Sequence, residues 1–597
     1  MIRGARDITA MAPVPLGGSR IETSVPAPRP LVNPVMVGLM LAAILCLKLM
    51  AIRSFRVDSD ETQHAHVVWG WATGRLQYRD VFDNHMPLFH MLCAPYFALF
   101  GEYSDILLPL RLAMLPIYGV CLWSLFRLGE ELFSRTAGWC ACILAALIPA
   151  FFYPSTEFRP DDLWAALWFL TLLVAISGRF TFRRAFKVGI LLGLTAAVST
   201  KTVFLGAALC VAAAFAFVLR VWSGSGRLGA RRVLLSLLAI GCGAVIFPGA
   251  IAIYFAAKGS FGIFFYCVFQ HNIVPGLKRW GNISHTCWVF PMALPFIAAY
   301  AVYIFRQAQA VDLGIRRVLI LTTPFLYEAL MYSYCPDLSR QDDLPYVPLL
   351  TLTVIPLVLS LARHWPERSV QKGFLTYLFP ALVLAEILWT WNAYDLHGKG
   401  LRRVVTQINV VLRLTGKGDY VMDAKSDYIF RDRPYYWALE PVTRARIRLG
   451  LIQDNIPECL EKTATKVSYL YPTYPGTDSA KFIAANYLPF DPRLPEIGVA
   501  GKVIGKPAQG ATCTFIVSIP ASYAVESEVG ETKGTLDDVA YTKAVRLEPG
   551  PHRFLRSGGG GRIAIILSAA TEEGFHPLYD RSEQLIKLMS KPHPAGD

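Results

Sequence analysis

Long apolar runs recur through the first two thirds of this chain and decide its class. Hydrophobic residues make up 54% of the 597 residues and charged residues only 17%, with a mean hydropathy of +0.39. The runs approach the roughly 20 residues that a helix needs to cross a bilayer. About eleven spans are expected, at 33–52, 105–126, 136–153, 162–177, 186–199, 202–219, 233–256, 287–305, 318–334, 344–362 and 374–391. The sequence therefore predicts an integral, polytopic membrane protein with an all-α membrane region surrounded by lipids.

The loops between these runs indicate how the chain is oriented. Arginine gathers in every second connection, for example at Arg127 and Arg135 and again at Arg316 and Arg317. The positive-inside rule places these loops in the cytoplasm. The net charge of +14 is then an orientation signal, and we expect no nucleic-acid partner. The proline-rich stretch 1–32 is expected to be a disordered cytoplasmic tail, followed by a retained first span and not by a cleaved signal peptide.

Beyond about residue 400 the sequence resembles that of a soluble domain. An odd number of spans places 400–597 on the exoplasmic side, which is the periplasm if the chain lies in a bacterial inner membrane. Strand-like runs at 420–422, 466–470, 514–520 and 562–568 predict a small α/β unit over 400–505 and a β-rich, sandwich-like unit over 506–575. The run Gly558–Gly561 is expected to be a hairpin turn. Cys459 and Cys513 could form a disulfide there.

The connections on the exoplasmic side carry ionisable groups close to the membrane boundary. They are Asp58, Asp60 and Glu61; Glu157, Arg159, Asp161 and Asp162; Lys201; Lys278 and Arg279; and Asp337, Arg340, Asp342 and Asp343. A solitary charge near the bilayer centre costs about 2.5–3.5 kcal/mol or more unless it is paired or wetted. We therefore expect these groups to converge on one outward-facing aqueous cavity. They could instead be solvated loop charges.

Carboxylates and cations beside a lipid-accessible cavity suit the transfer of a sugar from a lipid-linked phosphate. A carboxylate can take the proton of the acceptor hydroxyl while a cation neutralises the departing phosphate. The sequence contains no P-loop, dinucleotide-binding glycine motif or zinc-type cluster, so no resident cofactor is expected. A lipid or solute transporter or flippase is the alternative, although no internal repeat is visible. A glycan-binding receptor with inert spans would leave the acidic first loop unexplained.

Several motifs resemble, in order, those of the GT-C glycosyltransferases, specifically the group of protein O-mannosyltransferases and lipid A aminoarabinose transferases. They are Asp60-Glu61-Thr62, Asp83-Asn84-His85-Met86-Pro87-Leu88, Phe100-Gly101, Leu110-Arg111-Leu112, Phe158-Arg159-Pro160-Asp161-Asp162, Ser199-Thr200-Lys201 and Tyr346-Val347-Pro348 after Arg340. The likeness covers roughly residues 33–392. It implies a GT-C membrane catalytic domain over 33–399 with a catalytic first exoplasmic loop at 53–104. It also implies inverting transfer from a polyprenyl-phosphate-linked donor to a lipid, glycan or protein acceptor.

The resemblance also implies roles for single residues. Asp60 would be the catalytic general base, Glu61 its paired acid and Asp161 a second acid. His85 stands where relatives often have a lysine that contacts the donor phosphate, and it is positive only if its pKa is raised. Otherwise other cations must carry that charge. The expected substrate-binding set is His85, Arg159, Asp162, Lys201, Lys278, Arg279, Arg340 and Tyr346.

Three other interpretations of these residues remain open at this point. Asp60 could cap an amphipathic helix expected over 61–74. Asp58 and Asp60 could ligate a divalent cation, which would then be a cofactor. Lys201 could simply extend toward the membrane interface.

Overall fold

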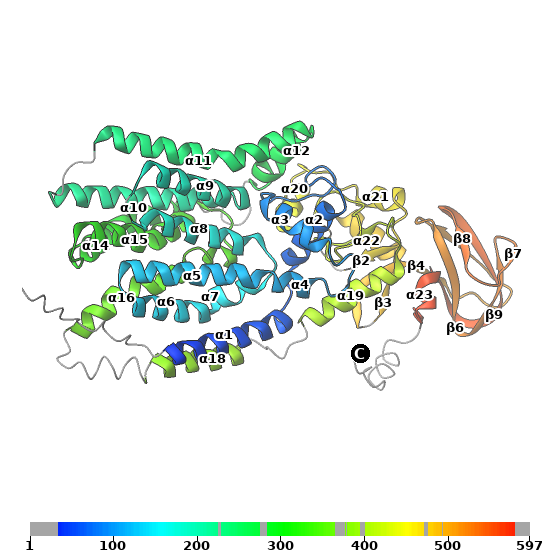
Figure 1. Ribbon diagram of the computed structural model, residues 1–597. Helices are drawn as coiled ribbons and strands as arrows, with labels where there is room; N and C mark the ends of the chain where they lie inside the picture. The colour runs from blue at the N-terminus through cyan, green and yellow to red at the C-terminus, as the bar shows by residue number, and fades with distance from the viewer. Residues whose placement is uncertain are drawn as a thin grey trace, which may run out of the picture.

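The computed structural model describes residues 34–178, 180–224, 229–274, 283–363, 377, 379–393, 400–470, 474, 476–491 and 493–578. Within them, a region of packed helices is followed by a region built around a β-sheet (Figure 1). The expected tail 1–32, Lys278 and Arg279 lie outside the described residues.

The helical region contains elements that coincide with each of the expected spans. They are α1 (Pro34–Ser54), α2 (Ser59–Ala72), α3 (Leu88–Phe97), α4 (Leu107–Leu112), α5 (Met114–Leu132), α6 (Arg135–Leu147), α7 (Pro149–Phe152), the 3-10 helix η1 (Pro154–Thr156), α8 (Pro160–Ile176), α9 (Phe182–Val198), α10 (Thr202–Trp222), α11 (Ala230–Ala257), α12 (Phe261–Phe265), the π-helix η2 (Tyr266–Gln270), α13 (Ile283–Thr286), α14 (Val289–Arg306), α15 (Val311–Tyr334), the 3-10 helix η4 (Arg340–Asp343), α16 (Val347–Arg363) and α18 (Phe379–Ala393).

Five segments in the described part of the chain are long and apolar enough to cross a membrane. They are Pro34–Ser54, Leu107–Leu132, Thr202–Trp222, Ala230–Ala257 and Ile283–Arg306. A sixth is possible if Arg135–Leu147 and Pro149–Thr156, which meet at 71°, form one bent span. Pro149 explains this break, because its ring excludes the hydrogen bond that would continue α6. The protein is therefore an integral membrane protein with several apolar spans.

Helices α9 and α11 pack closely because glycines line their contact. A Cβ atom on Gly193 would lie 2.6 Å from the carbonyl oxygen of Ala244, and one on Gly243 would lie 2.6 Å from that of Phe186. Only glycine leaves room for backbones this close, which is a common way for membrane helices to associate. The contact holds α11 against the rest of the helical region.

The C-terminal region begins with α19 (Gly400–Leu414) and continues as a mixed sheet with short helices. The remaining elements are β1 (Val421–Met422), α20 (Pro441–Arg448), α21 (Ile456–Lys462), β2 (Val467–Tyr469), α22 (Thr477–Asn486), β3 (Tyr487–Asp491), β4 (Leu494–Gly505), β5 (Thr512–Val517), β6 (Ala521–Leu536), β7 (Val539–Ala540), β8 (Val545–Leu547), β9 (Gly550–Leu567) and α23 (Ser568–Glu572). Strands β1 and β2 are parallel, and the other pairs are antiparallel.

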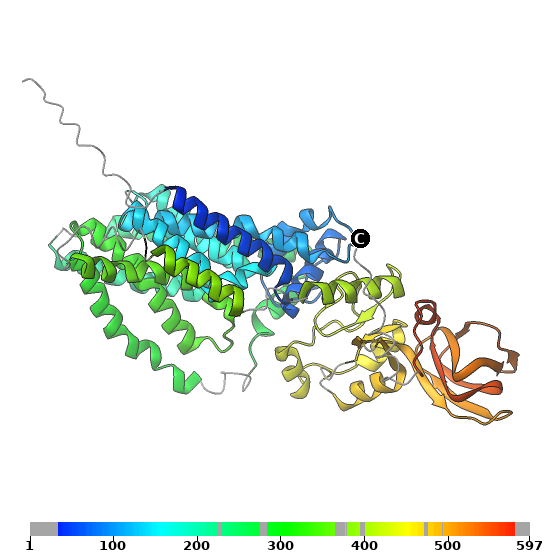
Figure 2. The same cartoon turned by 90° about the horizontal axis from the view of Figure 1, so that it is seen from below.

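The nine strands belong to one connected sheet, ordered β1-β2-β4-β9-β6-β7, with β3 beside β4, β5 beside β9 and β8 beside β6. The four strand-like runs expected from the sequence coincide with β1, β2, β5 and β9. Both views place this sheet beyond the end of the helical region at which α2 and α3 lie (Figures 1 and 2). The long strand β4 joins the part of the sheet nearest the helices to the part farthest from them.

One local expectation in this region is wrong, and one open question is answered. Gly558–Gly561 do not form a hairpin turn but lie inside β9, opposite β6, where the pairing register shifts repeatedly. Gly559 and Gly561 have φ of 82° and 72°, a backbone conformation that glycine adopts easily and that β-bulges often need. The glycine run therefore allows β9 to form bulges. Cys459 and Cys513 are both free thiols and form no disulfide.

Candidate active site

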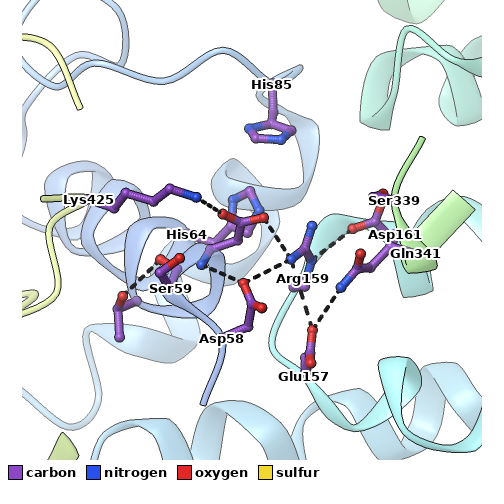
Figure 3. A network of polar contacts seen from close by, with 12 residues as sticks. Asp58, Ser59, His64, His85, Glu157, Arg159, Asp161, Ser339, Gln341 and Lys425 are labelled. Atoms are coloured by element: carbon purple, nitrogen blue, oxygen red, sulfur yellow. Dashed lines mark hydrogen bonds and ion pairs between the residues drawn. The ribbon is translucent and has the colours of Figure 1, made fainter. Parts of the chain in front are cut away.

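Arg159 lies at the centre of a group of carboxylates at the end of the helical region. Its Nη1 lies 2.8 Å from Asp60 Oδ2 and 3.5 Å from Asp58 Oδ1, and its Nε lies 3.2 Å from Asp161 Oδ2 (Figure 3). Glu157 Oε2 is 3.9 Å from the same Nη1. The guanidinium is only 7% exposed, so a single buried cation holds four acidic groups together. Asp58, Asp60, Arg159 and Asp161 thus lie together as expected, whereas the outward-facing aqueous cavity stays a prediction.

The local sequence explains where Arg159 stands. Pro160 begins α8, as proline often does at the first position of a helix, because its missing N–H would have no partner there. Arg159 is extended, with φ −141° and ψ 154°, and therefore projects before the helix starts. Asp161 follows in the first turn of α8, where the helix dipole favours negative charge.

Asp60 has a second cationic partner that the sequence did not suggest. Lys425 Nζ lies 2.6 Å from Asp60 Oδ1, and in Figure 3 Lys425 and Arg159 approach from opposite sides. Burial alone would raise the pKa of Asp60, but the charges of Arg159 and Lys425, with a smaller contribution from His85, hold that pKa well below its usual range. Asp60 is therefore an ionised carboxylate with both oxygens engaged.

Asp60 does not cap α2, contrary to one interpretation of the sequence. Asp58 is the N-cap residue, and its Oδ1 accepts a hydrogen bond of 3.0 Å from the backbone N–H of Asp60. The same pair does not fit a divalent cation either. Both oxygens of Asp60 already meet cations, and Oδ1 of Asp58 serves the cap and Arg159.

A tight turn after β1 presents Lys425. Asp423 accepts hydrogen bonds from the backbone N–H groups of Ser426 (2.7 Å) and Tyr428 (3.2 Å). Ser426 and Ile429 both have positive φ, 68° and 60°, which is rare for a β-branched residue such as isoleucine. Surrounding bonds must hold such a backbone in place. We therefore regard this turn as a fixed support for Lys425.

The first loop and the C-terminal region are bonded directly to each other. His66 Nδ1 lies 2.6 Å from the carbonyl oxygen of Ile429. Arg75 donates two hydrogen bonds to Asp432, of 2.7 and 2.5 Å. Asn84 Nδ2 donates to Glu440 Oε1 over 2.9 Å. Asp60 is therefore enclosed between a loop of the helical region and a segment more than 300 residues later in the chain.

Glu61 occupies a different environment from Asp60. It is fully buried, and each of its oxygens lies 2.6 Å from the guanidinium of Arg111. Its Oε1 also accepts a hydrogen bond of 3.0 Å from the backbone N–H of Phe158. Arg111 further donates to the carbonyl oxygens of Ile52 and Phe55, both at 3.0 Å. Glu61 thus ties α2 to the end of α1, to α4 and to the loop that carries Arg159.

Asp162 is separate from its neighbour Asp161. It is 2% exposed, and among the described residues its Oδ2 has no hydrogen-bond partner. Lys48, in α1, is also buried and donates to Ser155 Oγ (2.8 Å) and Thr156 Oγ1 (2.9 Å) in the turn before α8. Lys48 is not among the expected site residues, although a lysine inside an apolar span is a signal that the sequence offers.

The loop before α16 contributes further groups. Lys201 Nζ lies 2.6 and 2.8 Å from the two oxygens of Asp342, so it does not simply extend toward the membrane interface. Gln341 donates to Glu157 Oε2 over 3.1 Å and so connects η4 to the Arg159 cluster. Tyr346 packs against Tyr327 with ring centroids 5.7 Å apart, whereas Arg340 is exposed.

Histidines form a second polar group beside the first. His85 Nδ1 lies 2.9 Å from Asp83 Oδ1, and His64 Nδ1 lies 3.0 Å from His90 Nε2. Burial lowers the pKa of His85, but the carboxylate of Asp83, together with Asp60 and Asp161, outweighs it, so the net direction is upward. A raised pKa favours the protonated form of His85, in keeping with the condition set for a contact with phosphate.

Part of the helical region is similar to a known protein family. Residues 84–252 match the family described as dolichyl-phosphate-mannose-protein mannosyltransferase. No curated protein sequence matches the chain.

Three of the similar solved structures illustrate the likeness. ArnT from Cupriavidus metallidurans, bound to undecaprenyl phosphate, is 12% identical with a TM-score of 0.50, covering 78% of this chain and 97% of ArnT. The same protein in the apo state gives a TM-score of 0.49 at 12% identity and the same coverage. The oligosaccharyltransferase AglB from Archaeoglobus fulgidus, in complex with an inhibitory peptide and a dolichol-phosphate, gives 0.40 at 12% identity, covering 78% of this chain and 75% of AglB.

The family match covers the segment that contains His85, Arg159 and Lys201, and the ArnT likeness extends the shared fold into the C-terminal region. Residues 84–252 of this chain are therefore similar to that mannosyltransferase family, and the chain shares its fold with ArnT.

Proposed function

We propose that this enzyme transfers a sugar from a polyprenyl-phosphate carrier to a hydroxyl group of a lipid, glycan or protein acceptor, with inversion at the anomeric carbon. One observation carries the proposal: the ionised Asp60 lies between two cations, Arg159 and Lys425, at the end of the helical region. A base and a phosphate-binding charge are the two groups that this reaction needs. The undecaprenyl phosphate bound to ArnT supports the class of carrier.

The proposed reaction is a single displacement. The acceptor oxygen attacks the anomeric carbon from the side opposite the phosphate, and its proton moves to Asp60. The bond between the anomeric carbon and the phosphate oxygen breaks, and the carrier leaves as polyprenyl phosphate with the bonding electrons. Because bond formation and bond breaking occur on opposite faces, the anomeric configuration inverts.

Asp60 can act as this base only if its cations are drawn away. In the resting protein Arg159 and Lys425 stabilise the ionised carboxylate and make it a poor proton acceptor. A donor phosphate offers the same cations a competing anion, and charge-assisted bonds from arginine to phosphate are strong. We propose that the donor takes over part of these contacts, so that the pKa of Asp60 rises when the donor is in place.

The surrounding residues then receive distinct roles. Glu61 acts as a positioning residue, since Arg111 occupies both of its oxygens. Asp161 orients Arg159 and does not itself take a proton. Lys201 and Tyr346 shape the far side of the site. Arg340, Lys278, Arg279 and Asp162 stay in the expected donor-binding set.

We also propose the orientation in the membrane. Helices α8, α9, α16 and α18 have 15–17 residues, and α15 carries charges at its ends, yet each matches a run expected to span. Counting them gives the eleven spans of a GT-C catalytic domain over 33–399. With basic loops inside, the N-terminus is cytoplasmic and 400–597 is a soluble domain in the periplasm of a bacterial inner membrane.

A transfer assay with purified protein in proteoliposomes tests the proposal. Radiolabelled sugars on polyprenyl monophosphate should be consumed and appear on an added acceptor, with the anomeric configuration of the product inverted by NMR. Asp60→Asn serves as the inactive control. Movement of the intact carrier across the bilayer without transfer would instead support the transporter alternative.

A further inference from the structure

His64, Asp83 and His85 offer three metal-ligand atoms that lie within 4.8 Å of one another. They come from two segments, because His64 is in α2 and the other two precede α3. Two imidazole nitrogens and one carboxylate oxygen are a donor set typical of catalytic zinc, with metal–ligand distances of about 2.0–2.2 Å. Tetrahedral ligands at such distances lie about 3.4 Å apart. Small side-chain rotations could therefore bring the three ligand atoms, now within 4.8 Å of one another, to the separation that coordination requires.

His64 supplies an independent sign of a missing partner. Its side chain is 0% exposed, and Nε2 has no hydrogen-bond partner among the described residues. A buried polar atom in this state costs free energy of the order of 1–3 kcal/mol. The rings of His64 and His85 meet edge to face with centroids 4.7 Å apart (Figure 3), so His64 lies directly against the cluster.

The neighbours of His64 and Asp83 provide the outer shell that a metal site requires. His64 Nδ1 lies 3.0 Å from His90 Nε2, and when His64 donates this hydrogen, its Nε2 carries a free lone pair. His90 Nδ1 lies 3.6 Å from Asp83 Oδ2. Gln77 Nε2 donates to the same Oδ2 over 2.7 Å. Such partners fix the ring orientation of metal-bound histidines and brace the ligating carboxylate.

The charge and exposure of the site suit a divalent cation. Asp83 is fully buried, whereas 35% of the His85 side chain is exposed, so the cluster is closed on one side and open on the other. In Figure 3 His85 lies beside the network that joins Lys425 and Arg159, the two cations bonded to Asp60. Its open side therefore belongs to the same polar region as Asp60.

We propose that His64, Asp83 and His85 bind one Zn²⁺ ion and leave a fourth position open beside Asp60. In that position the ion would bind an oxygen of the donor phosphate as a Lewis acid. This last step rests on the proposed function, whereas zinc binding itself does not. The site would add a third positive charge to those of Arg159 and Lys425.

Metal binding to the purified full-length protein tests the site without any sugar donor. The protein is stripped with a chelator in detergent and titrated with Zn²⁺, and Co²⁺ serves as a probe because tetrahedral Co²⁺ absorbs visible light. Wild type should bind one ion per chain. His85→Ala and His64→Gln should each weaken binding at least 100-fold, the upper end of the loss caused by removing an outer-shell partner. The matched control is His552→Gln, which removes a histidine paired with a carboxylate, Asp537, in the distant sheet.

The outcomes separate the site from the reaction. If wild type binds Zn²⁺ no more tightly than His85→Ala does, the zinc site is refuted. If the same metal-stripped protein still transfers sugar, the proposed function is supported all the same. If the melting temperature shows that His64→Gln does not fold, the zinc site is judged from His85→Ala alone, because the His85 side chain is partly exposed. Zinc binding through these residues without any transfer supports the site and refutes the function. A Co²⁺ spectrum that polyprenyl phosphate leaves unchanged overturns the open fourth position.

Discussion

Glu61→Gln removes the negative charge from a fully buried ion pair while keeping the size of the side chain. Arg111, 0% exposed, would keep its carbonyl partners Ile52 and Phe55 but lose its only close counter-charge among the described residues. Removing one partner of a buried pair typically costs about 3–5 kcal/mol, because the other charge stays buried and uncompensated. We therefore expect this single change to lower the stability of the protein strongly.

Thermal unfolding of the purified protein in detergent measures the effect. Glu548→Gln is the matched control, since the Arg546–Glu548 pair is 61% and 66% exposed and such pairs contribute about 0–1 kcal/mol. The double variant Glu61→Gln with Arg111→Met should recover part of the lost stability, because no buried charge is left unpaired.

The same experiment separates the two roles considered for Glu61. A positioning residue should lose stability and transfer together, and the Arg111→Met double variant should regain some of both. If Glu61→Gln melts like wild type but has lost its kcat, Glu61 takes part in the chemistry and our reading of the Arg111 pair is refuted.

Three further outcomes are expected. Asp60→Asn should keep donor affinity, measured in a binding assay, but lower kcat, measured in a transfer assay, on the order of 10²-fold or more. Equal losses of donor affinity and kcat would contradict the role of Asp60 as the base. Lys425→Met removes a cation that depresses the pKa of Asp60. A carboxylate with a depressed pKa stays ionised until the pH falls through that pKa. As the pH is lowered, kcat/KM of the variant should therefore begin to fall at a higher pH than kcat/KM of wild type. If both fall at the same pH, Lys425 does not control the pKa of Asp60. A membrane-impermeant protease added to spheroplasts should digest the chain beyond residue 400, whereas protection of that part would reverse the proposed orientation.

The helices were predictable from the sequence because a bilayer leaves few choices. An apolar run of the right length must satisfy its backbone hydrogen bonds internally, so each expected span became a helix. The grouping of Asp60, Arg159 and Asp161 was predictable for a related reason, since charges at the ends of spans on one side meet at one surface. Local sequence was enough to find both.

What the sequence could not predict depends on contacts across the chain. Lys425 is 365 residues from Asp60, and nothing in the residues around it distinguishes it from any other surface lysine. Gly558–Gly561 looked like a turn because glycine runs serve turns and bulges alike, and only the pairing with β6 decides between them. His64 and Asp83 have no motif spacing, so their meeting depends on how the first loop folds back onto α2.

On the proposed mechanism, the two sources of cation make the activation of Asp60 depend on the donor. Without a donor phosphate to draw Arg159 and Lys425 away, Asp60 stays a poor proton acceptor. Arg159 from the helical region and Lys425 from the C-terminal region together occupy both oxygens of Asp60, so neither region alone fully restrains the base. Because the turn that carries Lys425 is held by Asp423, this restraint does not depend on a flexible side chain finding its partner. The C-terminal region then acts on the chemistry as well as on acceptor access, and its packing against the first loop becomes a condition for transfer.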